Sequence, residues 1–396
     1  MKTDWEGRVI RTVLVLLAFI SLGCRVIESL VPGSSVEPTE VAATPHPAPT
    51  ATATSVPPTP TIKPPDTETP EPMGVYGPFA VVSPAAPEVA VFDVRSAPDA
   101  ALWLSTDAGL SVLRAGSWAQ LGGAQATMLG FDAASRAWTA DESGDRVTVW
   151  SGSASRTMGI ESGWSAAGRI SQARPYATVN DRLITDGRGW SWLVTSHDVR
   201  VFDGEVWRVF PSAEAGFAPT AEMVDMGIEP RLRDVAIDSV GDVWVTDCTW
   251  GGPGPMGLGA RWYNGTAWEG QTSSVVGSGC VEAIEVDGAG RIWLGIDGDL
   301  WRYVPGQGWE EFAHPDVALP QDTRWGYIVD LVLGGDGEVW VTMAPCGGAS
   351  CGVGLFQLFH VREGSWTHLD LSQSGSEAAW VALALGQQGK GWACAG

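Results

Sequence analysis

Residues 284–312 read IEVDGAGRIWLGIDGDLWRYVPGQGWEEF, and this stretch contains four short apolar segments separated by glycine-containing turns. Alternation of apolar and polar residues over about four to eight positions is typical of half-buried β-strands. A second copy begins at Val235 and places Trp244 where the first copy has Trp293. The two copies predict a repeated unit of four short antiparallel strands.

Tryptophan recurs at the centre of each copy and again near its end. The chain has 21 tryptophans among 396 residues, an unusually high share that the repeat explains. The central position is occupied by Trp103, Trp138, Trp192, Trp244, Trp293, Trp340 and Trp392, and the second by Trp118, Trp150, Trp207, Trp268, Trp309 and Trp366. Four-stranded repeats of about 40–50 residues are typical of β-propeller blades. A large flat indole suits the space between adjacent blades.

The copy at 284–312 resembles the repeat of two-component-regulator propellers. Similar copies cover 235–268 and 329–366, and weaker ones cover 91–118, 128–150 and 183–207. The resemblance implies an extracytoplasmic propeller of the kind found in hybrid histidine kinases, although this chain has no kinase segment. We expect an all-β fold with a β-propeller over 74–396, with seven blades or, as the alternative, six. Val75–Val82 is expected to complete the short last copy and close the ring.

The N-terminus has the features of an export signal. Basic residues precede an apolar run from Val13 to Leu22, which is too short to span ~30 Å of hydrocarbon. The run ends in Ser-Leu-Gly-Cys at Cys24 and resembles a bacterial lipoprotein signal, in which that cysteine is lipidated and becomes the first mature residue. We expect a signal peptide over 1–23 and a lipid on Cys24, with a plain cleaved signal as the alternative.

The segment 24–73 is predicted to be a disordered tether. Between Val31 and Pro72, proline occurs 12 times and threonine 9 times. Such a composition cannot bury enough apolar surface to offset the conformational entropy of the chain. We expect the tether to hold a monomeric propeller away from the outer face of a bacterial membrane. The net charge of −22, without a cluster of Lys and Arg, argues against nucleic acid as a partner.

The cysteines predict disulfides, because an exported chain meets an oxidising environment. Cys346 and Cys351 lie in one expanded loop, 344–354. Cys248 lies in the other expanded loop, 247–259, and Cys280 in the following connection between blades, so both should lie on one face. We expect these two pairs, with Cys394 left over. A zinc site from Cys248, Cys346 and Cys351 is the alternative, but no histidine lies at ligand spacing.

The two expanded loops mark a candidate ligand face, because binding residues concentrate on loops of rigid scaffolds. Three aromatic residues predicted in loops suit stacking on a glycan or peptide, or else fill gaps between blades: Trp250, Trp325 and Tyr327. Acidic residues that follow the central tryptophans could form an axial ring for Ca²⁺ or a cationic ligand: Asp107, Asp141, Asp198, Asp247 and Asp297. We favour the simpler interpretation that these aspartates form turns, and we expect no cofactor or metal.

No strong catalytic motif occurs in the sequence, and both a P-loop and His-Glu-x-x-His are absent. His197, next to Asp198, is the one histidine near the candidate face. The sequence therefore favours a non-catalytic module that binds a glycan, peptide or protein at the cell surface. The alternative is a propeller lyase or hydrolase that uses His197 and aspartates of the loop face.

Overall fold

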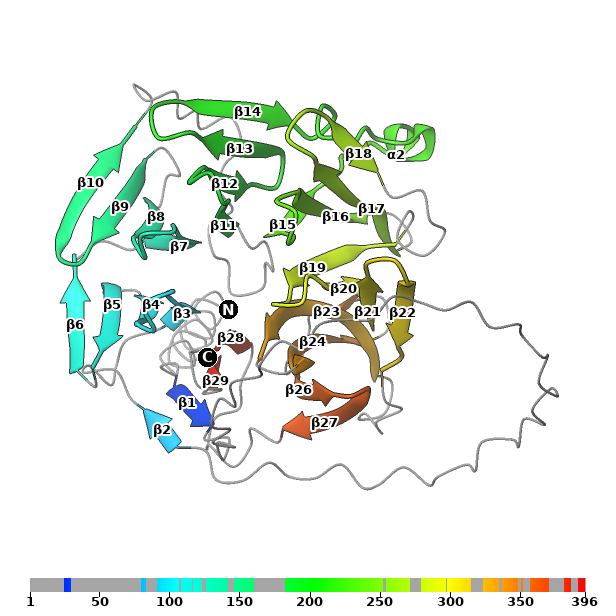
Figure 1. The fold of residues 1–396 in the computed structure, drawn as a ribbon. Coiled ribbons are helices and arrows are strands. Elements are labelled where there is room, and N and C mark those ends of the chain that lie inside the picture. Colours follow the sequence, from blue (N-terminus) through cyan, green and yellow to red (C-terminus); the bar gives the residue numbers. More distant parts are fainter. Residues whose placement is uncertain are drawn as a thin grey trace, which may run out of the picture.

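The structure is a computed structural model in which the strands are arranged around a central axis (Figure 1). It describes residues 25–29, 80–82, 91–106, 108–115, 117–122, 126–141, 146–159, 182–251, 254–270, 279–296, 298–314, 323–334, 337–347, 350–351, 357–369, 381–385 and 391–395. Within these ranges no helix has the length and apolar character that crossing a membrane would require.

The strands form antiparallel blades that follow one another in sequence, and we number the blades in that order. Blade 1 contains β3 (Val91–Ser96), β4 (Leu102–Thr106), β5 (Gly109–Arg114) and β6 (Ser117–Leu121). Blade 2 contains β7 (Ala126–Phe131), β8 (Ala137–Asp141), β9 (Val147–Ser151) and β10 (Ala154–Met158). Blade 3 contains β11 (Arg182–Thr185), β12 (Ser191–Val194), β13 (Asp198–Phe202) and β14 (Trp207–Pro211), and the short helix α2 (Ala221–Asp225) follows it.

The next three blades repeat this order. Blade 4 contains β15 (Leu232–Ile237), β16 (Val243–Gly251), β17 (Gly254–Tyr263) and β18 (Trp268–Gly270). Blade 5 contains β19 (Val281–Val286), β20 (Ile292–Ile296), β21 (Asp299–Val304) and β22 (Gly308–Phe312). Blade 6 contains β23 (Thr323–Leu333), β24 (Val339–Gly347), β25 (Ser350–Cys351), β26 (Gln357–Arg362) and β27 (Ser365–Leu369). The all-β propeller predicted from the repeat is confirmed.

A further sheet joins the two ends of the chain, and we call it the closing sheet. Its order is β2 (Ala80–Val82), β1 (Arg25–Ser29), β29 (Gly391–Ala395) and β28 (Val381–Leu385). Ala80–Val82 supplies the outer strand, as the sequence predicted. Arg25–Ser29 lies within the predicted tether, but in the structure it is a strand paired along β29. Composition averaged over 24–73 conceals this five-residue segment, RVIES, which contains β-branched residues and no proline.

The remainder of the predicted tether, 30–73, lies outside the described residues, and so do the predicted signal peptide and Cys24. Those expectations stay predictions.

The repeated Asp-to-Trp spacing of six residues has a structural cause. In four blades an aspartate in the turn between the first two strands accepts the indole N–H of the central tryptophan. The pairs are Trp138–Asp132 at 2.9 Å, Trp192–Asp186 at 3.0 Å, Trp244–Asp238 at 2.9 Å and Trp293–Asp287 at 3.1 Å. The same carboxylates accept backbone N–H groups of the turn. One side chain therefore closes the turn and orients the indole, which explains why both residues recur.

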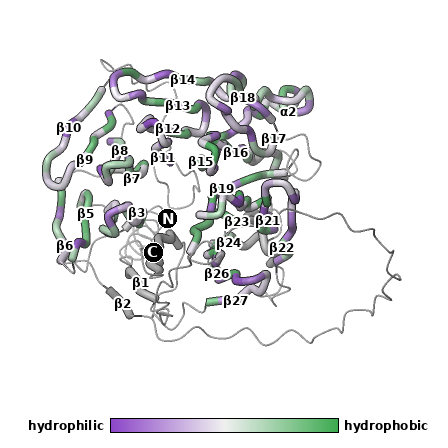
Figure 2. Tube along the Cα trace, viewed as in Figure 1, coloured by the Kyte–Doolittle hydropathy of each residue, from purple (hydrophilic) through white to green (hydrophobic). Residues whose placement is uncertain are grey.

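The central indoles pack between neighbouring blades, as predicted. Trp103 of blade 1 packs with Met128 and Ala137 of blade 2, and Trp293 of blade 5 packs with residues of blade 6. Figure 2 shows hydrophobic residues along inner and middle strands such as β15, β5 and β9. The outer strands β6 and β22 are mostly exposed or half-buried. The core is thus a series of interblade layers around the axis.

Blades 2 and 3 approach each other most closely at the axis, where Leu183 and Gly130 form a parallel bridge. A Cβ on Gly130 would lie 2.1 Å from the Leu183 carbonyl oxygen, and the glycine has a φ of +152°. Only glycine allows this approach of two backbones. The bridge joins the two blades into one eight-stranded sheet.

Candidate functional site

Two hairpins are longer than their counterparts and extend on one face of the propeller, which we call the hairpin face. In blade 4, β16 and β17 have 9 and 10 residues. In blade 6, β23 and β24 have 11 and 9 residues. The first two strands of blades 1 and 5 have only 5 or 6 residues each. The face on which the sequence placed its expanded loops is therefore built largely of strand.

This extension corrects the placement of three aromatic residues that the sequence assigned to loops. Trp250 pairs with Pro255 in the ladder of β16 and β17. Trp325 and Tyr327 pair with Pro345 and Ala344 in the ladder of β23 and β24. The sequence could not show that the ladders continue through proline- and glycine-containing segments. The side chains of the three aromatic residues lie outside the described part of the structure.

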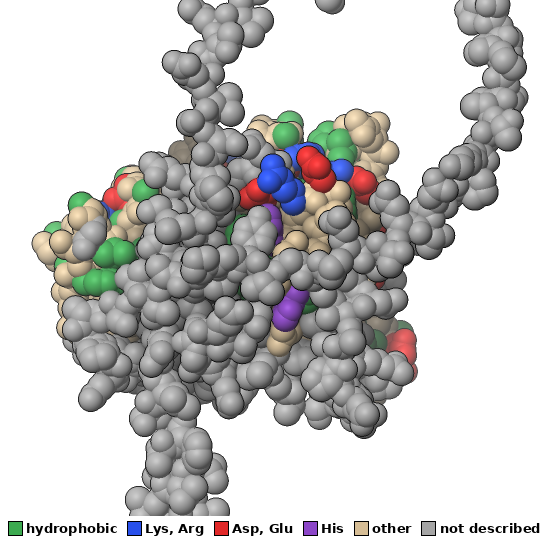
Figure 3. Space-filling model, turned by 90° about the horizontal axis from the view of Figure 1, so that it is seen from below, with side chains coloured by type: hydrophobic (Ala, Val, Ile, Leu, Met, Phe, Trp, Pro, Cys, Tyr) green, Lys and Arg blue, Asp and Glu red, His purple; other side chains and the backbone are tan. Residues whose placement is uncertain are grey.

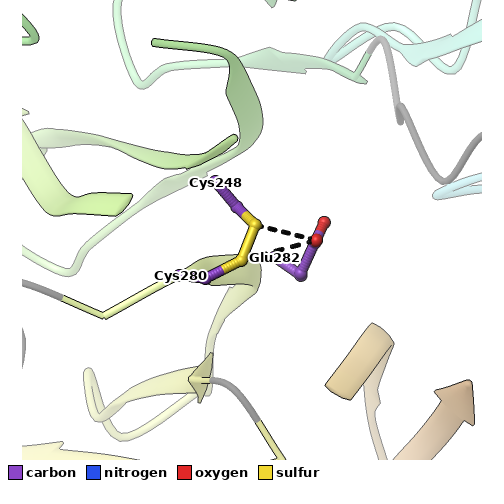
Figure 4. Close-up of side chains that lie close together, drawn as sticks. All are labelled: Cys248, Cys280 and Glu282. Atoms are coloured by element: carbon purple, nitrogen blue, oxygen red, sulfur yellow. Dashed lines mark hydrogen bonds between the residues drawn. A yellow bond between two sulfur atoms is a disulfide. The ribbon is translucent and has the colours of Figure 1, made fainter. Parts of the chain in front are cut away.

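Cys248 and Cys280 form a disulfide, as predicted, and it ties the hairpin of blade 4 to the first strand of blade 5 (Figure 4). Both residues are buried. Glu282, also buried, places Oε1 2.9 Å from Cys248 Sγ and Oε2 3.4 Å from Arg233 Nε. Arg233 Nε donates to the Cys248 carbonyl at 2.6 Å. The arginine thus balances a carboxylate that would otherwise be costly to bury.

The two cysteines of the other predicted pair, Cys346 and Cys351, lie directly opposite each other in the antiparallel pairing of β24 and β25. Their side chains lie outside the described part, so their disulfide stays a prediction. The zinc alternative would need thiolates, and Cys248 is already oxidised.

Asp247 faces the inside of blade 4. It is fully buried and accepts the backbone N–H groups of Leu258 at 2.6 Å and Arg231 at 2.9 Å. Burial outweighs these hydrogen bonds and raises the pKa of Asp247 to about 7. This carboxyl group fixes the base of the long hairpin.

The other described members of the predicted acidic ring also have local partners. Asp198 accepts hydrogen bonds from Thr195 Oγ1 at 2.7 Å and Arg200 Nε at 2.8 Å. Asp141 accepts the backbone N–H of Arg146 at 3.4 Å. These contacts follow the turn-forming interpretation rather than an axial ring. Asp107 and Asp297 lie outside the described residues.

His197 is exposed and does not pair with the neighbouring Asp198. Its Nδ1 lies 2.5 Å from Ser196 Oγ, whereas the Asp198 carboxylate is held by Thr195 and Arg200. An exposed imidazole bonded to a serine hydroxyl has neither the buried orienting carboxylate nor the enclosed pocket typical of a general base.

The sequence analysis missed a cluster of charged side chains on the innermost strands, which we call the axial cluster. Its members are Asp93 and Arg95 on β3, Arg182 on β11, Asp234 on β15, Glu285 on β19 and Asp330 on β23. The signal was available, because each is a charged residue within an otherwise largely apolar first strand. A single charged residue in a short strand does not by itself indicate that it faces the axis, nor which residue of another blade is its partner.

Arg182 is the centre of this cluster. Its Nη1 donates to both carboxylate oxygens of Asp234 at 3.1 and 3.2 Å and to the Ile284 carbonyl at 3.3 Å, and its Nη2 donates to Glu285. Asp234 in turn accepts the backbone N–H of Ile284 at 2.9 Å. One guanidinium group therefore ties blades 3, 4 and 5 together at the axis.

Burial and ion pairing act in opposite directions on the axial cluster. Burial raises the pKa of Glu285 and raises that of Asp330 to about 7, and in both cases it outweighs the attraction of Arg182. The same burial lowers the pKa of Arg182, but Asp234 and Glu285 more than compensate and keep its pKa above the usual value. The guanidinium group of Arg182 is therefore the positive charge that the carboxyl groups of this cluster share.

Comparisons with known proteins show the fold. No family model matches the chain, and no curated protein matches it. The extracellular domain of the putative one-component system BT4673 from B. thetaiotaomicron is 14% identical with a TM-score of 0.51, and the match covers 79% of this chain and 39% of that one. A streptogramin B lyase is 12% identical with a TM-score of 0.50, covering 78% of this chain and 94% of that one. At such identities the likeness establishes a β-propeller and leaves its activity open.

Proposed function

We propose that this protein is a lipid-anchored, extracytoplasmic β-propeller that binds a glycan, peptide or protein without catalysis and uses the hairpin face to do so. The observation that carries the proposal is the asymmetry of that face. A repeated fold gives each blade similar short turns, yet blades 4 and 6 carry long hairpins. Rigid scaffolds that carry enlarged segments on one face are typical of binding proteins.

The fixation of the blade 4 hairpin supports this use. The Cys248–Cys280 disulfide and the buried Asp247 hold the hairpin base on both sides. A surface that is ordered before its ligand arrives loses less conformational entropy on binding. Trp250 lies in the ladder beyond this base, and tryptophan is the residue type most enriched where binding energy concentrates.

Binding is tested by screening glycan and peptide arrays with the exported chain. Each hit is measured again with Trp250→Ala and with residues 251–254 replaced by Asn-Gly, which shortens the tip and leaves Asp247 and Cys248 in place. Val240→Ser, an 80% exposed position in the turn at the opposite face, is the matched control. We expect at least about tenfold weaker binding for the tip variants and no change for the control. Empty arrays, or hits that ignore the tip, would refute the proposal.

The enzymatic alternative keeps one specific prediction. The likeness to a streptogramin B lyase is one of fold, and a lyase or hydrolase in this chain would depend on His197. Any activity found on candidate substrates that His197→Ala abolishes, while Val240→Ser retains it, would replace the binding proposal.

Attachment to the membrane is tested at Cys24. Cleavage before Cys24 would leave β1 intact, since this strand begins at Arg25. We expect mass spectrometry to find a diacylglyceryl group on Cys24 and Cys24→Ser to release the protein into the soluble fraction, because two acyl chains suffice for stable anchoring. An unmodified Cys24 in a membrane-free protein would contradict the anchor and leave the binding proposal standing.

A further inference from the structure

Blades 2 and 3 border a cavity of about 280 Å³ that is partly open to solvent and that the repeat does not predict. The two blades touch at the axis through Leu183 and Gly130 and diverge toward the rim. Trp138 and Trp207 belong to one buried cluster between the two blades, and Phe202 packs against it. The lining of the cavity includes residues beside the turn between the third and fourth strands of blade 2 and of blade 3. These turns lie on the face opposite the hairpin face.

The walls of the cavity are largely apolar and aromatic. Trp138 and Phe202 line it with their ring centroids 5.8 Å apart in an edge-to-face arrangement, and Met158 is 4% exposed beside them. The indole N–H of Trp138 is already bonded to Asp132 at 2.9 Å. The ring therefore offers only its apolar surface, which suits a flat hydrocarbon or aromatic group.

The polar part of the lining is basic. Arg136 and Arg156 both border the cavity, together with the hydroxyl-bearing Ser151 and Ser155, and no acidic side chain lines it. Arg136 uses Nε to bond Asp132 at 2.6 Å. Arg156 forms no ion pair with any residue in the described ranges. Because Asp132 already compensates Arg136, Arg156 is the positive charge that remains for an anion at this cavity, and Arg136 keeps guanidinium N–H groups beside it.

We propose that this interblade cavity binds a small aromatic carboxylate, with the ring against Trp138 and Phe202 and the carboxylate on Arg156 and Arg136. A planar guanidinium group matches a carboxylate through two parallel hydrogen bonds. The volume of about 280 Å³ lies near the lower end of the range for small-molecule sites, which suits one or two fused rings with a short acid side chain. The same chemistry occurs in a free aromatic acid and in the C-terminal residue of a peptide that ends in phenylalanine or tryptophan.

Isothermal titration calorimetry of the full exported chain tests the proposal with four probes. Phenylacetate and indole-3-acetate represent the free acids, phenylacetamide removes the charge, and acetyl-Gly-Gly-Phe with a free carboxylate represents the peptide end. We expect an acid to bind at millimolar or lower concentration and phenylacetamide to bind at least about tenfold more weakly. Tighter binding of the peptide than of phenylacetate assigns the site to peptide ends, and the reverse order assigns it to free acids.

Two variants locate the binding. Arg156→Gln keeps a polar side chain of similar length and is expected to weaken the acid about tenfold, while Arg156→Glu abolishes binding. Arg362→Gln, at a side chain 58% exposed on blade 6, is the control and should change nothing. Thermal melting verifies that each variant is folded. The proposal is wrong if neither the acids nor the peptide bind at 10 mM, if phenylacetamide binds equally well, or if Arg156→Glu leaves binding unchanged.

Discussion

The turn aspartate that holds the central indole should contribute measurably to stability, and Asp186 is the best place to test this. Its side chain is 2% exposed. It accepts hydrogen bonds from Trp192 Nε1 at 3.0 Å, from the backbone N–H of Arg188 at 2.9 Å and from that of Trp190 at 3.1 Å. Asp186→Ala removes all three and leaves a fully buried indole N–H without an acceptor.

The magnitude follows from these contacts. A buried donor left without a partner costs about 1–3 kcal/mol. Loss of the turn hydrogen bonds resembles the loss of a helix N-cap, about 1 kcal/mol. The ion pair with Arg188, whose side chain is 44% exposed, adds little because exposed pairs contribute about 0–1 kcal/mol. We expect Asp186→Ala to lower the free energy of unfolding by about 2–4 kcal/mol, and Asp186→Asn by less, since an amide keeps an acceptor but directs an N–H toward one of the donors.

Urea unfolding followed by tryptophan fluorescence measures the effect. Asp203→Ala is the matched control, because Asp203 accepts two backbone N–H groups of its turn at 3.0 Å and no indole N–H. Its loss should be clearly smaller. A loss for Asp186→Ala within 0.5 kcal/mol of the control would refute the role assigned to the indole hydrogen bond.

The pKa of Asp186 also determines in which direction its contribution to stability changes with pH. Burial raises the pKa of Asp186, but the hydrogen bonds from Trp192, Arg188 and the turn backbone outweigh it and hold the pKa below the usual value. A carboxyl group with a lowered pKa in the folded state stabilises the protein above its unfolded pKa, and this contribution is lost as the pH falls through the folded pKa. The difference in stability between wild type and Asp186→Ala should therefore shrink in acid. A difference that grows below pH 4 would contradict the assignment.

Three further predictions concern other parts of the molecule. In blade 1, Ala97 occupies the turn position that the indole-binding aspartate has in four other blades, and the buried indole N–H of Trp103 has no acceptor in the described part of the chain. Ala97→Asp should therefore raise the free energy of unfolding, measured in urea, by about 1 kcal/mol. A decrease would contradict this prediction. Because burial raises the pKa of Asp330 to about 7, ionisation of this group destabilises the folded protein as the pH rises from about 4 to 7. Asp330→Asn should therefore reduce the fall in melting temperature over that pH range. An unchanged fall would contradict the prediction. Replacing Cys248 and Cys280 by alanine opens a loop with a sequence separation of 32 and should cost about 3–4 kcal/mol in the chain-entropy estimate, with a loss below 1 kcal/mol as the refuting result.

The architecture could be predicted because one residue type carries it. Trp244 and Trp293 recur at a spacing that only a stacked repeat explains, and the structure places both between blades. The Cys248–Cys280 disulfide was also predictable, since the blade pattern put both residues on one face. For the tryptophans and for the two cysteines, the position predicted from the local sequence pattern is also the position that the propeller fold requires.

The axial cluster was harder to predict, because it is made of contacts between strands far apart in sequence. Arg182 reaches Asp234 and Glu285, which lie 52 and 103 residues away. A charged residue in one apolar strand gives no sign of its partner in another blade. The expanded loop at 247–259 was predicted, but its strand content was not, since Gly251, Gly254 and Pro255 resemble a loop by composition although their backbone is part of the ladder.

Basic and acidic side chains are mixed in the coloured part of the surface shown in Figure 3. In the edge-on view of Figure 3, basic and acidic side chains lie beside one another among hydrophobic and other residues. Exposed pairs such as Arg114 with Asp99 at 2.6 Å belong to this pattern. Such exposed pairs contribute little to stability.

The position of β1 has a consequence for how the molecule would sit on a cell. Arg25 is paired with Ala395 at the end of β29 that corresponds to the hairpin face, so an acyl group on the preceding Cys24 would turn that face toward the lipid. Because β1 begins at Arg25, no residue separates Cys24 from the closing sheet, and an anchor on Cys24 would lie directly beside the disc. The long hairpins would then meet their ligand in the narrow layer next to the bilayer, while the interblade cavity would open toward the surrounding medium.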